Sequence, residues 1–205
     1  MPVWRFHNDD KVSVMTVQIN ERATRRLLHT RNVVCSGYER SDGLYDIVGT
    51  LLDTKADDSD IFFKYVQAGE PFHQMRLTMT IDLDLVIHAL TAHTDVGPTP
   101  YCAEISPVYT KLVGMKIGSG FKKRVLERVG GSLGCTHLTE LLGPMATTAF
   151  QTTFFLQREA QKQKCCDDPA YQMPRPWVIG TCHAYRAEGE AVRLIWPQTL
   201  SSPVG

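Results

Sequence analysis

The chain has 205 residues and a formal net charge of zero, with 22 basic and 22 acidic side chains. A balanced charge gives no whole-molecule attraction to nucleic acid, and no apolar run approaches the roughly 18 residues of a membrane helix. The N-terminal sequence MPVWRFHNDDKVSV lacks the basic and then apolar plan of a signal peptide. We therefore expect a cytoplasmic protein with no nucleic-acid or membrane partner. The sequence does not decide between a monomer and a homodimer.

Hydrophobic residues make up 43% of the chain and charged residues 21%, which is ordinary for a globular protein. The length suits one substantial core with an extension. We expect residues 1–29 to form an N-terminal extension, residues 30–198 a single α+β domain, and residues 199–205 a flexible tail.

Strands are predicted in the first half of the chain, at residues 31–40 and 44–55, before an acidic loop at KADDSD. Residues 73–81 and 85–93 alternate apolar and polar side chains, which predicts a β-hairpin with its odd-numbered face inward. Opposed residues of an antiparallel pair face the same side. With a three-residue loop His73 should lie opposite His93, and after a slip of two opposite Asp95.

Helices are predicted in the following part of the chain. One should run from Ser106 to Gly114, a second over residues 120–129, and a third from Cys135. Pro144 disfavours a helical conformation at the residue before it, so we expect a kink or break there. Residues 177–186 and 191–197 resemble a closing pair of strands. The order of strands, helices and then strands predicts an α+β fold with an antiparallel sheet and a packed helical layer.

The six cysteines should not form structural disulfides in a cytoplasmic protein. Cys135 lies at a predicted helix start in the segment GGSLGCTHLTELLG, where unpaired backbone N–H groups favour a thiolate. His137 would place an imidazole beside it. The alternative is a glycine-rich hinge in which Cys135 is simply packed.

His73 and Cys102 extend this layout to a candidate metal site. His73 begins the hairpin and Cys102 lies in the loop before the first predicted helix. A sheet edge and helix N-termini can converge at such places. Each residue alone is more often structural, so the site depends on the three segments meeting.

Three segments resemble an uncharacterised bacterial family, domain of unknown function 2889. They are AGEPFHQMRLTMTID, KLVGMKIGSGF and GCTHLTELLGPMATTAFQ, and the resemblance spans roughly residues 30–196. The order of elements is more distantly similar to U-type iron–sulfur scaffold proteins (NifU/SufE-like). That resemblance implies a NifU/SufE-like fold and places His73, Cys102 and Cys135 at the three ligand positions.

The sequence departs from the scaffold pattern at two positions. His73 stands where the scaffolds have a cysteine, and Met75 stands where they have an aspartate. The fourth ligand implied would then be His137, with His93, Asp95 or water as alternatives. This altered set favours a single zinc or iron ion over a cluster.

Three functions stay open from the sequence. The first is a metal-binding protein that holds zinc or iron through His73, Cys102, Cys135 and His137. The second is a thiol enzyme with Cys135 as nucleophile and His137 or His73 as base. The third is a non-catalytic module that binds a small molecule between the hairpin and the helices, or a partner. Whether any reaction is catalysed is left open.

Overall fold

The computed structural model describes residues 23–168 and 170–196. Four strands form one antiparallel sheet in the order β1-β2-β5-β6. They are β1 (His29–Glu39), β2 (Tyr45–Lys55), β5 (Pro71–Ile81) and β6 (Ile87–Val96). A small hairpin of β3 (Ser59–Ile61) and β4 (Lys64–Val66) connects β2 to β5.

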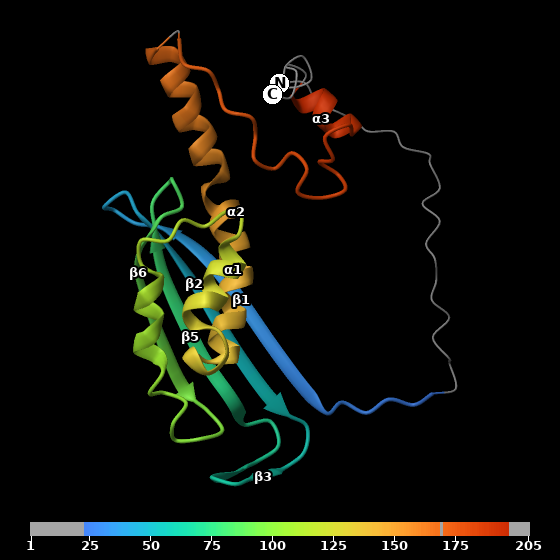
Figure 1. Cartoon of the computed structure of the whole chain (residues 1–205). Helices are drawn as coiled ribbons and strands as arrows, with labels where there is room; N and C mark the ends of the chain where they lie inside the picture. Colours follow the sequence, from blue (N-terminus) through green and yellow to red (C-terminus); the bar gives the residue numbers. More distant parts are fainter. Residues whose placement is uncertain (1–22, 169, 197–205) are drawn as a thin grey trace.

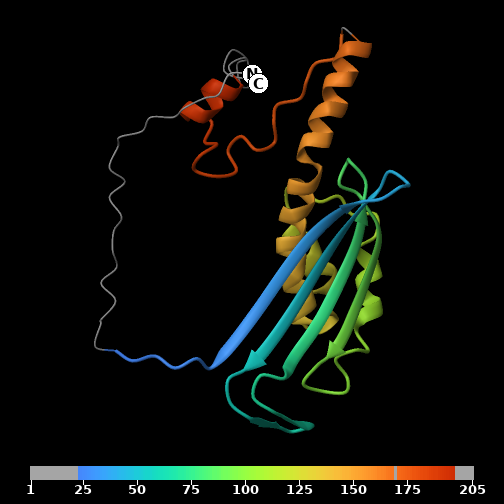
Figure 2. The same ribbon diagram turned by 180° about the vertical axis from the view of Figure 1, so that it is seen from behind.

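The helices follow the sheet in the chain, and all of them except the last, α3, lie over one of its faces, as the two opposite views show (Figures 1 and 2). They are η1 (Ser106–Leu112), α1 (Phe121–Val129), η2 (Gly131–Leu133), α2 (Thr136–Asp167) and α3 (Glu190–Ile195). The long helix α2 packs on β1, β2 and β5, while η1 packs on β6. Among the described residues, no helix lies on the other face of the sheet (Figure 2).

The core lies between this sheet and the helical layer. Odd positions of β2 and β5 point inward because side chains alternate along a strand. Their apolar members meet buried leucines of α2 such as Leu138 and Leu141. The buried residues of the two strands are Tyr45, Ile47, Leu51, Met75, Leu77, Met79 and Ile81.

The predicted α+β class, with its antiparallel sheet and helical layer, is confirmed, whereas a NifU/SufE-like fold is not confirmed. The strands predicted at 31–40 and 44–55 correspond to β1 and β2, and the helix predicted at 120–129 corresponds to α1. The helix predicted from Ser106 forms a 3-10 helix that ends at Leu112. Helix α2 runs across Pro144 without interruption.

The predicted hairpin register is wrong. Ile81 pairs with Ile87 and Thr80 with Ala89, so His88 is an extra residue on β6. Such a bulge reverses the facing of the side chains that follow it, here up to a second register shift after Thr94. His93 therefore lies opposite Arg76, is exposed, and faces away from His73, and Asp95 is also exposed.

The predicted pair of closing strands is also wrong. Residues 177–186 form turns, and the second predicted strand is largely the short helix α3. The predicted N-terminal extension lies mostly, and the predicted tail entirely, outside the described residues. No helix in the described part of the chain has the length and apolar character to cross a membrane.

Candidate functional site

A row of charged side chains crosses three strands on the inner face of the sheet. Asp53, near the end of β2, lies opposite Arg31 of β1 on one side and His73 of β5 on the other. Opposed residues share a face, so all three side chains meet under the helical layer. Asp53 and His73 are both buried.

Asp53 is the centre of this row. The Arg31 guanidinium donates two hydrogen bonds to its carboxylate, from Nε to Oδ1 and from Nη2 to Oδ2, each 2.8 Å. His73 Nδ1 lies 2.9 Å from Oδ2, and His29 Nε2 lies 3.3 Å from Oδ1. A carboxylate so placed fixes the orientation of the His73 ring and leaves its Nε2 free of the carboxylate.

His137 joins the site from the first turn of α2. Its ring centroid is 3.9 Å from that of His73, with an angle of 36° between the planes. Asp53, His73 and His137 can each offer one ligand atom such that these atoms all lie within 4.8 Å of one another. One turn further, Glu140 Oε2 accepts a 3.0 Å hydrogen bond from Arg31, which ties α2 to β1.

The start of α2 is fixed by a buried tyrosine. The Tyr109 hydroxyl donates a 2.8 Å hydrogen bond to the Cys135 carbonyl and accepts one of 3.0 Å from the Cys135 backbone N–H. Gly134 passes so close to the Val129 carbonyl that a Cβ atom there would collide with it. The glycine-rich turn therefore lets α2 begin against the sheet, where it presents His137 to His73.

The electrostatics keep the carboxylate charged and the imidazoles neutral. Burial alone would raise the pKa of Asp53, but the hydrogen bonds and charge of Arg31, together with His73, lower it to about 2. Burial and the neighbouring His137 lower the pKa of His73. Burial and the charge of Arg31 lower the pKa of His137. Neutral imidazoles are the form that binds a metal or accepts a proton.

The structure brings together two of the four predicted ligands, His73 and His137. Within the described residues, the one metal-competent group holds no cysteine. The Cys102 thiol lies 3.1 Å from the Thr99 hydroxyl, in the loop after β6. Cys135 is the N-cap residue of α2 and packs against the hydrophobic core.

Sequence reasoning missed Asp53, Arg31 and Glu140. One signal was available for Asp53: it occupies an odd position of β2, on the face that carries Ile47 and Leu51. An acidic side chain on the apolar face of a strand needs a partner. The identity of that partner depends on the register between strands, which the sequence does not show.

Comparison with known protein families identifies the family of this chain. A family model described as "Protein of unknown function (DUF2889)" matches residues 29–151, more than half of the chain. This range includes every residue of the site. No curated protein and no solved structure matches the chain. The distant resemblance to U-type iron–sulfur scaffolds is not supported by these findings.

Proposed function

The chain belongs to the DUF2889 family, whose function is unknown, and we propose that it binds one zinc or iron ion through His73 and His137. One observation carries this proposal: Asp53 holds Nδ1 of a buried histidine whose ring lies against a second histidine. Metal-binding histidines almost always have their second nitrogen bound to a carboxylate, a carbonyl or water. Imidazole ligands suit zinc and iron.

Asp53 is best explained as the group that orients His73. Both of its oxygens already accept hydrogen bonds from Arg31, and a metal would have to compete with that pair. The remaining coordination positions would be filled by water, by Glu140, or by the predicted thiols of Cys102 and Cys135. A water on the metal would have a pKa lowered toward about 7, which would make the site suited to hydrolysis.

Metal analysis of protein purified without an affinity tag tests the proposal. We expect close to one equivalent of zinc or iron in the full-length chain, and less than about a tenth of that in His137→Ala. His137 is partly exposed, so this substitution should leave the fold intact. His93→Ala is the matched control, because His93 is exposed on the opposite face of the sheet. Equal metal content in wild type and His137→Ala would refute the proposal.

Cobalt substitution decides which residues complete the site. Cobalt(II) bound by a cysteine shows an intense near-ultraviolet thiolate charge-transfer band, whereas nitrogen and oxygen ligands do not. If the ligands are His73, His137 and oxygen atoms, the cobalt-loaded protein should show no such band. The affinity for cobalt should then be unchanged in Cys102→Ser and in Cys135→Ser. A band that disappears in either variant would restore that cysteine to the ligand set.

A thiol enzyme is the second candidate, and the same hydrogen bond favours it. A base held by a carboxylate is what activates a nucleophilic thiol, and His73 is so held by Asp53. Cys135 begins the helix that carries His137. Rapid alkylation of Cys135 in metal-free protein, slowed at least tenfold in His73→Gln, would support this candidate, and uniformly slow alkylation would exclude it.

A further inference from the structure

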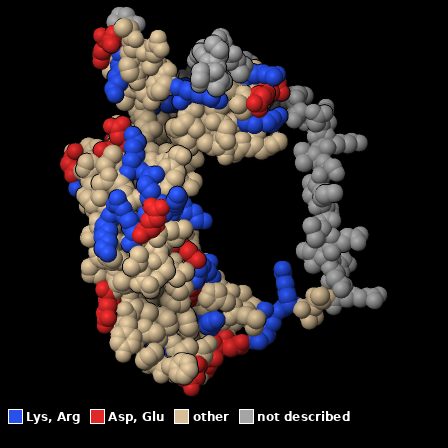
Figure 3. All heavy atoms as spheres, viewed as in Figure 1, with Lys and Arg blue, Asp and Glu red and all other residues tan. Residues whose placement is uncertain are grey.

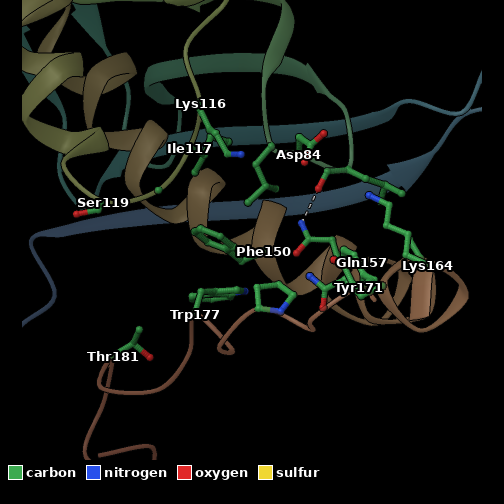
Figure 4. A pocket seen from close by; sticks show the side chains of 16 residues that line it. Asp84, Lys116, Ile117, Ser119, Phe150, Gln157, Lys164, Tyr171, Trp177 and Thr181 are labelled. Carbon is green, nitrogen blue, oxygen red and sulfur yellow. Dashed lines mark hydrogen bonds between the residues drawn. The ribbon is translucent and has the colours of Figure 1, made fainter. Parts of the chain in front are cut away.

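A large cavity lies along the part of α2 from Phe150 to Lys164, away from the first turn that carries His137, and Figure 4 shows the side chains that line it. Its volume is about 1050 Å³, and it lies between the β5–β6 loop, residues 116–119, residues 150–164 of α2 and residues 171–181. Ligand-binding pockets typically span about 300–1000 Å³ and are mostly apolar. This cavity is therefore large enough for a small organic molecule.

Hydrogen bonds fix two walls of the cavity. Gln157 of α2 donates from Nε2 to the Leu83 carbonyl, 2.8 Å away, which holds the β5–β6 loop against the helix. The Ile117 backbone N–H donates to the Leu85 carbonyl at 2.9 Å. Leu85 has a φ of 64°, a conformation that side chains other than glycine rarely adopt. These walls are thus formed before any ligand arrives.

Aromatic rings form the side that faces the C-terminal segment. Phe150 of α2 stacks on Trp177, with ring centroids 4.1 Å apart and planes 30° from parallel. Tyr171 also lines the cavity, nearer to Gln157 and Lys164 (Figure 4). Trp177 is still 44% exposed, so much of its indole surface is not covered by the chain. A flat apolar ligand could cover that surface with favourable stacking.

The charged residues around the cavity favour an anion. Lys116 and Lys164 line it together with one acidic residue, Asp84. Neither lysine forms an ion pair with any residue that the structure describes. Arg124 donates hydrogen bonds to the carbonyls of Ser119 and Lys116 at the edge of the cavity, each 2.8 Å long. Figure 3 shows several basic side chains on the main body of the molecule in this view, with acidic ones among them. The local potential is therefore positive although the whole chain is neutral.

We propose that this cavity binds a small amphipathic anion with a flat aromatic body. The body would lie against Phe150 and Trp177, and the carboxylate, sulfonate or phosphate would lie near Lys116 and Lys164. The site is separate from the proposed metal centre. Phe150 lies 13 positions after His137 on α2, about 20 Å along the helix at 1.5 Å per residue.

Fluorescence of a bound dye tests the proposal on the full-length protein. The probe is 8-anilinonaphthalene-1-sulfonate, an aromatic sulfonate whose emission rises on transfer to an apolar site. We expect saturable binding of one equivalent, weakened at least tenfold in Trp177→Ala, because the stacked aromatic surface is lost. Phe62→Ala is the control for dye on exposed aromatic surface, since Phe62 is fully exposed elsewhere, and it should bind normally. Unchanged affinity in Trp177→Ala overturns the proposal.

A neutral dye distinguishes the contribution of the aromatic rings to binding from the contribution of the anionic group. N-phenyl-1-naphthylamine has the same rings without the sulfonate. The double variant Lys116→Gln, Lys164→Gln should weaken the binding of the sulfonate dye about threefold to tenfold, since two exposed charge pairs with the sulfonate are lost. It should leave the binding of the neutral dye unchanged. Lys122→Gln with Lys123→Gln is the matched control. An equal effect on both dyes, or none on either, would overturn the assignment of an anion. None of these results depends on metal.

Discussion

At the scale of single residues, the site depends on the groups that stabilise the negative charge of the buried Asp53 carboxylate. A buried carboxylate would ordinarily gain a proton, because desolvation penalises its charge. Two hydrogen bonds from Arg31 reverse that outcome and hold the pKa of Asp53 at about 2. The carboxylate therefore remains an acceptor for His73 Nδ1 at neutral pH, and the imidazole keeps one orientation.

The same shifts predict two stages of acid destabilisation. His73 and His137 have lowered pKa values in the folded chain, so the unfolded chain binds protons first as the pH falls below about 6.5. Stability should fall from that pH downward. Asp53 has a folded pKa of about 2, against about 3.9 when unfolded. The contribution of Asp53 to the free energy of unfolding is present above pH 4 and is lost between about pH 4 and pH 2.

Urea unfolding of metal-free protein at a series of pH values measures both stages. His137→Gln should reduce the loss of stability between pH 6.5 and 5, because it removes one depressed imidazole and the neighbour that lowers the pKa of His73. The stage below pH 4 should persist in this variant. A pH profile identical to that of wild type between pH 6.5 and 5 would contradict the lowered pKa values.

At the scale of elements, the packing of α2 on β1 has one very close approach. A Cβ atom on Gly37 of β1 would collide with the Thr152 side chain of α2. Gly37→Ala should therefore destabilise the protein by about 1–3 kcal/mol, as overpacking does. Thr152→Ala in the same chain should recover part of this loss, because it removes the colliding Oγ1 and Cγ2 atoms while the Thr152 Cβ remains close.

A double-mutant cycle on urea unfolding gives the coupling between these two positions. The two substitutions should be non-additive by at least about 0.5 kcal/mol in the favourable direction, as for residues in contact. Additive effects would mean that β1 and α2 do not approach each other so closely in solution.

Elements with a strong local pattern could be predicted from the sequence. The alternation in β2 and β5 and the glycine-rich start of α2 identified these elements correctly. Two failures have physical causes. The bulge at His88 reverses the facing of β6 without any change in composition. The Val- and Ile-containing segment at 191–197 resembles a strand, yet residues 191–195 belong to α3 and the segment joins no described sheet.

The site was predictable only in part for a similar reason. His73 and His137 each lie near the start of a predicted element. We predicted that such ends converge, and this placed both histidines in one site. Asp53 became visible only through the pairing of β2 with β5. Whether Cys102 and Cys135 also serve as ligands stays a prediction, which the cobalt spectrum tests.

At the scale of the whole molecule, the main core and the C-terminal segment are separate. Every fully buried residue of the core cluster lies between Tyr45 and Ala149, inside the region that matches the family model. The buried Val192 and Trp196 are not members of that cluster. The sheet, α1 and the first half of α2 should therefore hold together without the residues that follow α2.

Truncation after Asp168 tests this separation. The shortened chain should unfold cooperatively, with a midpoint at most about 8 °C below that of the full chain, which corresponds to a loss of about 2 kcal/mol or less. It should keep any metal bound at His73 and His137 and lose the anilinonaphthalene dye, because Trp177 is removed. An insoluble or non-cooperative product would show that the C-terminal segment is part of the folding unit.

The length of α2 has one more consequence. Its 32 residues span about 48 Å, whereas strands of 11 residues span about 36 Å, and its last buried residue is Thr153. The final turns therefore project past the sheet (Figure 1). Amide protons in the first half should exchange with deuterium only on global opening. Those beyond Gln157, the last residue of α2 that holds the β5–β6 loop, should exchange by fraying from the end. One continuous helix would then contain two levels of kinetic protection.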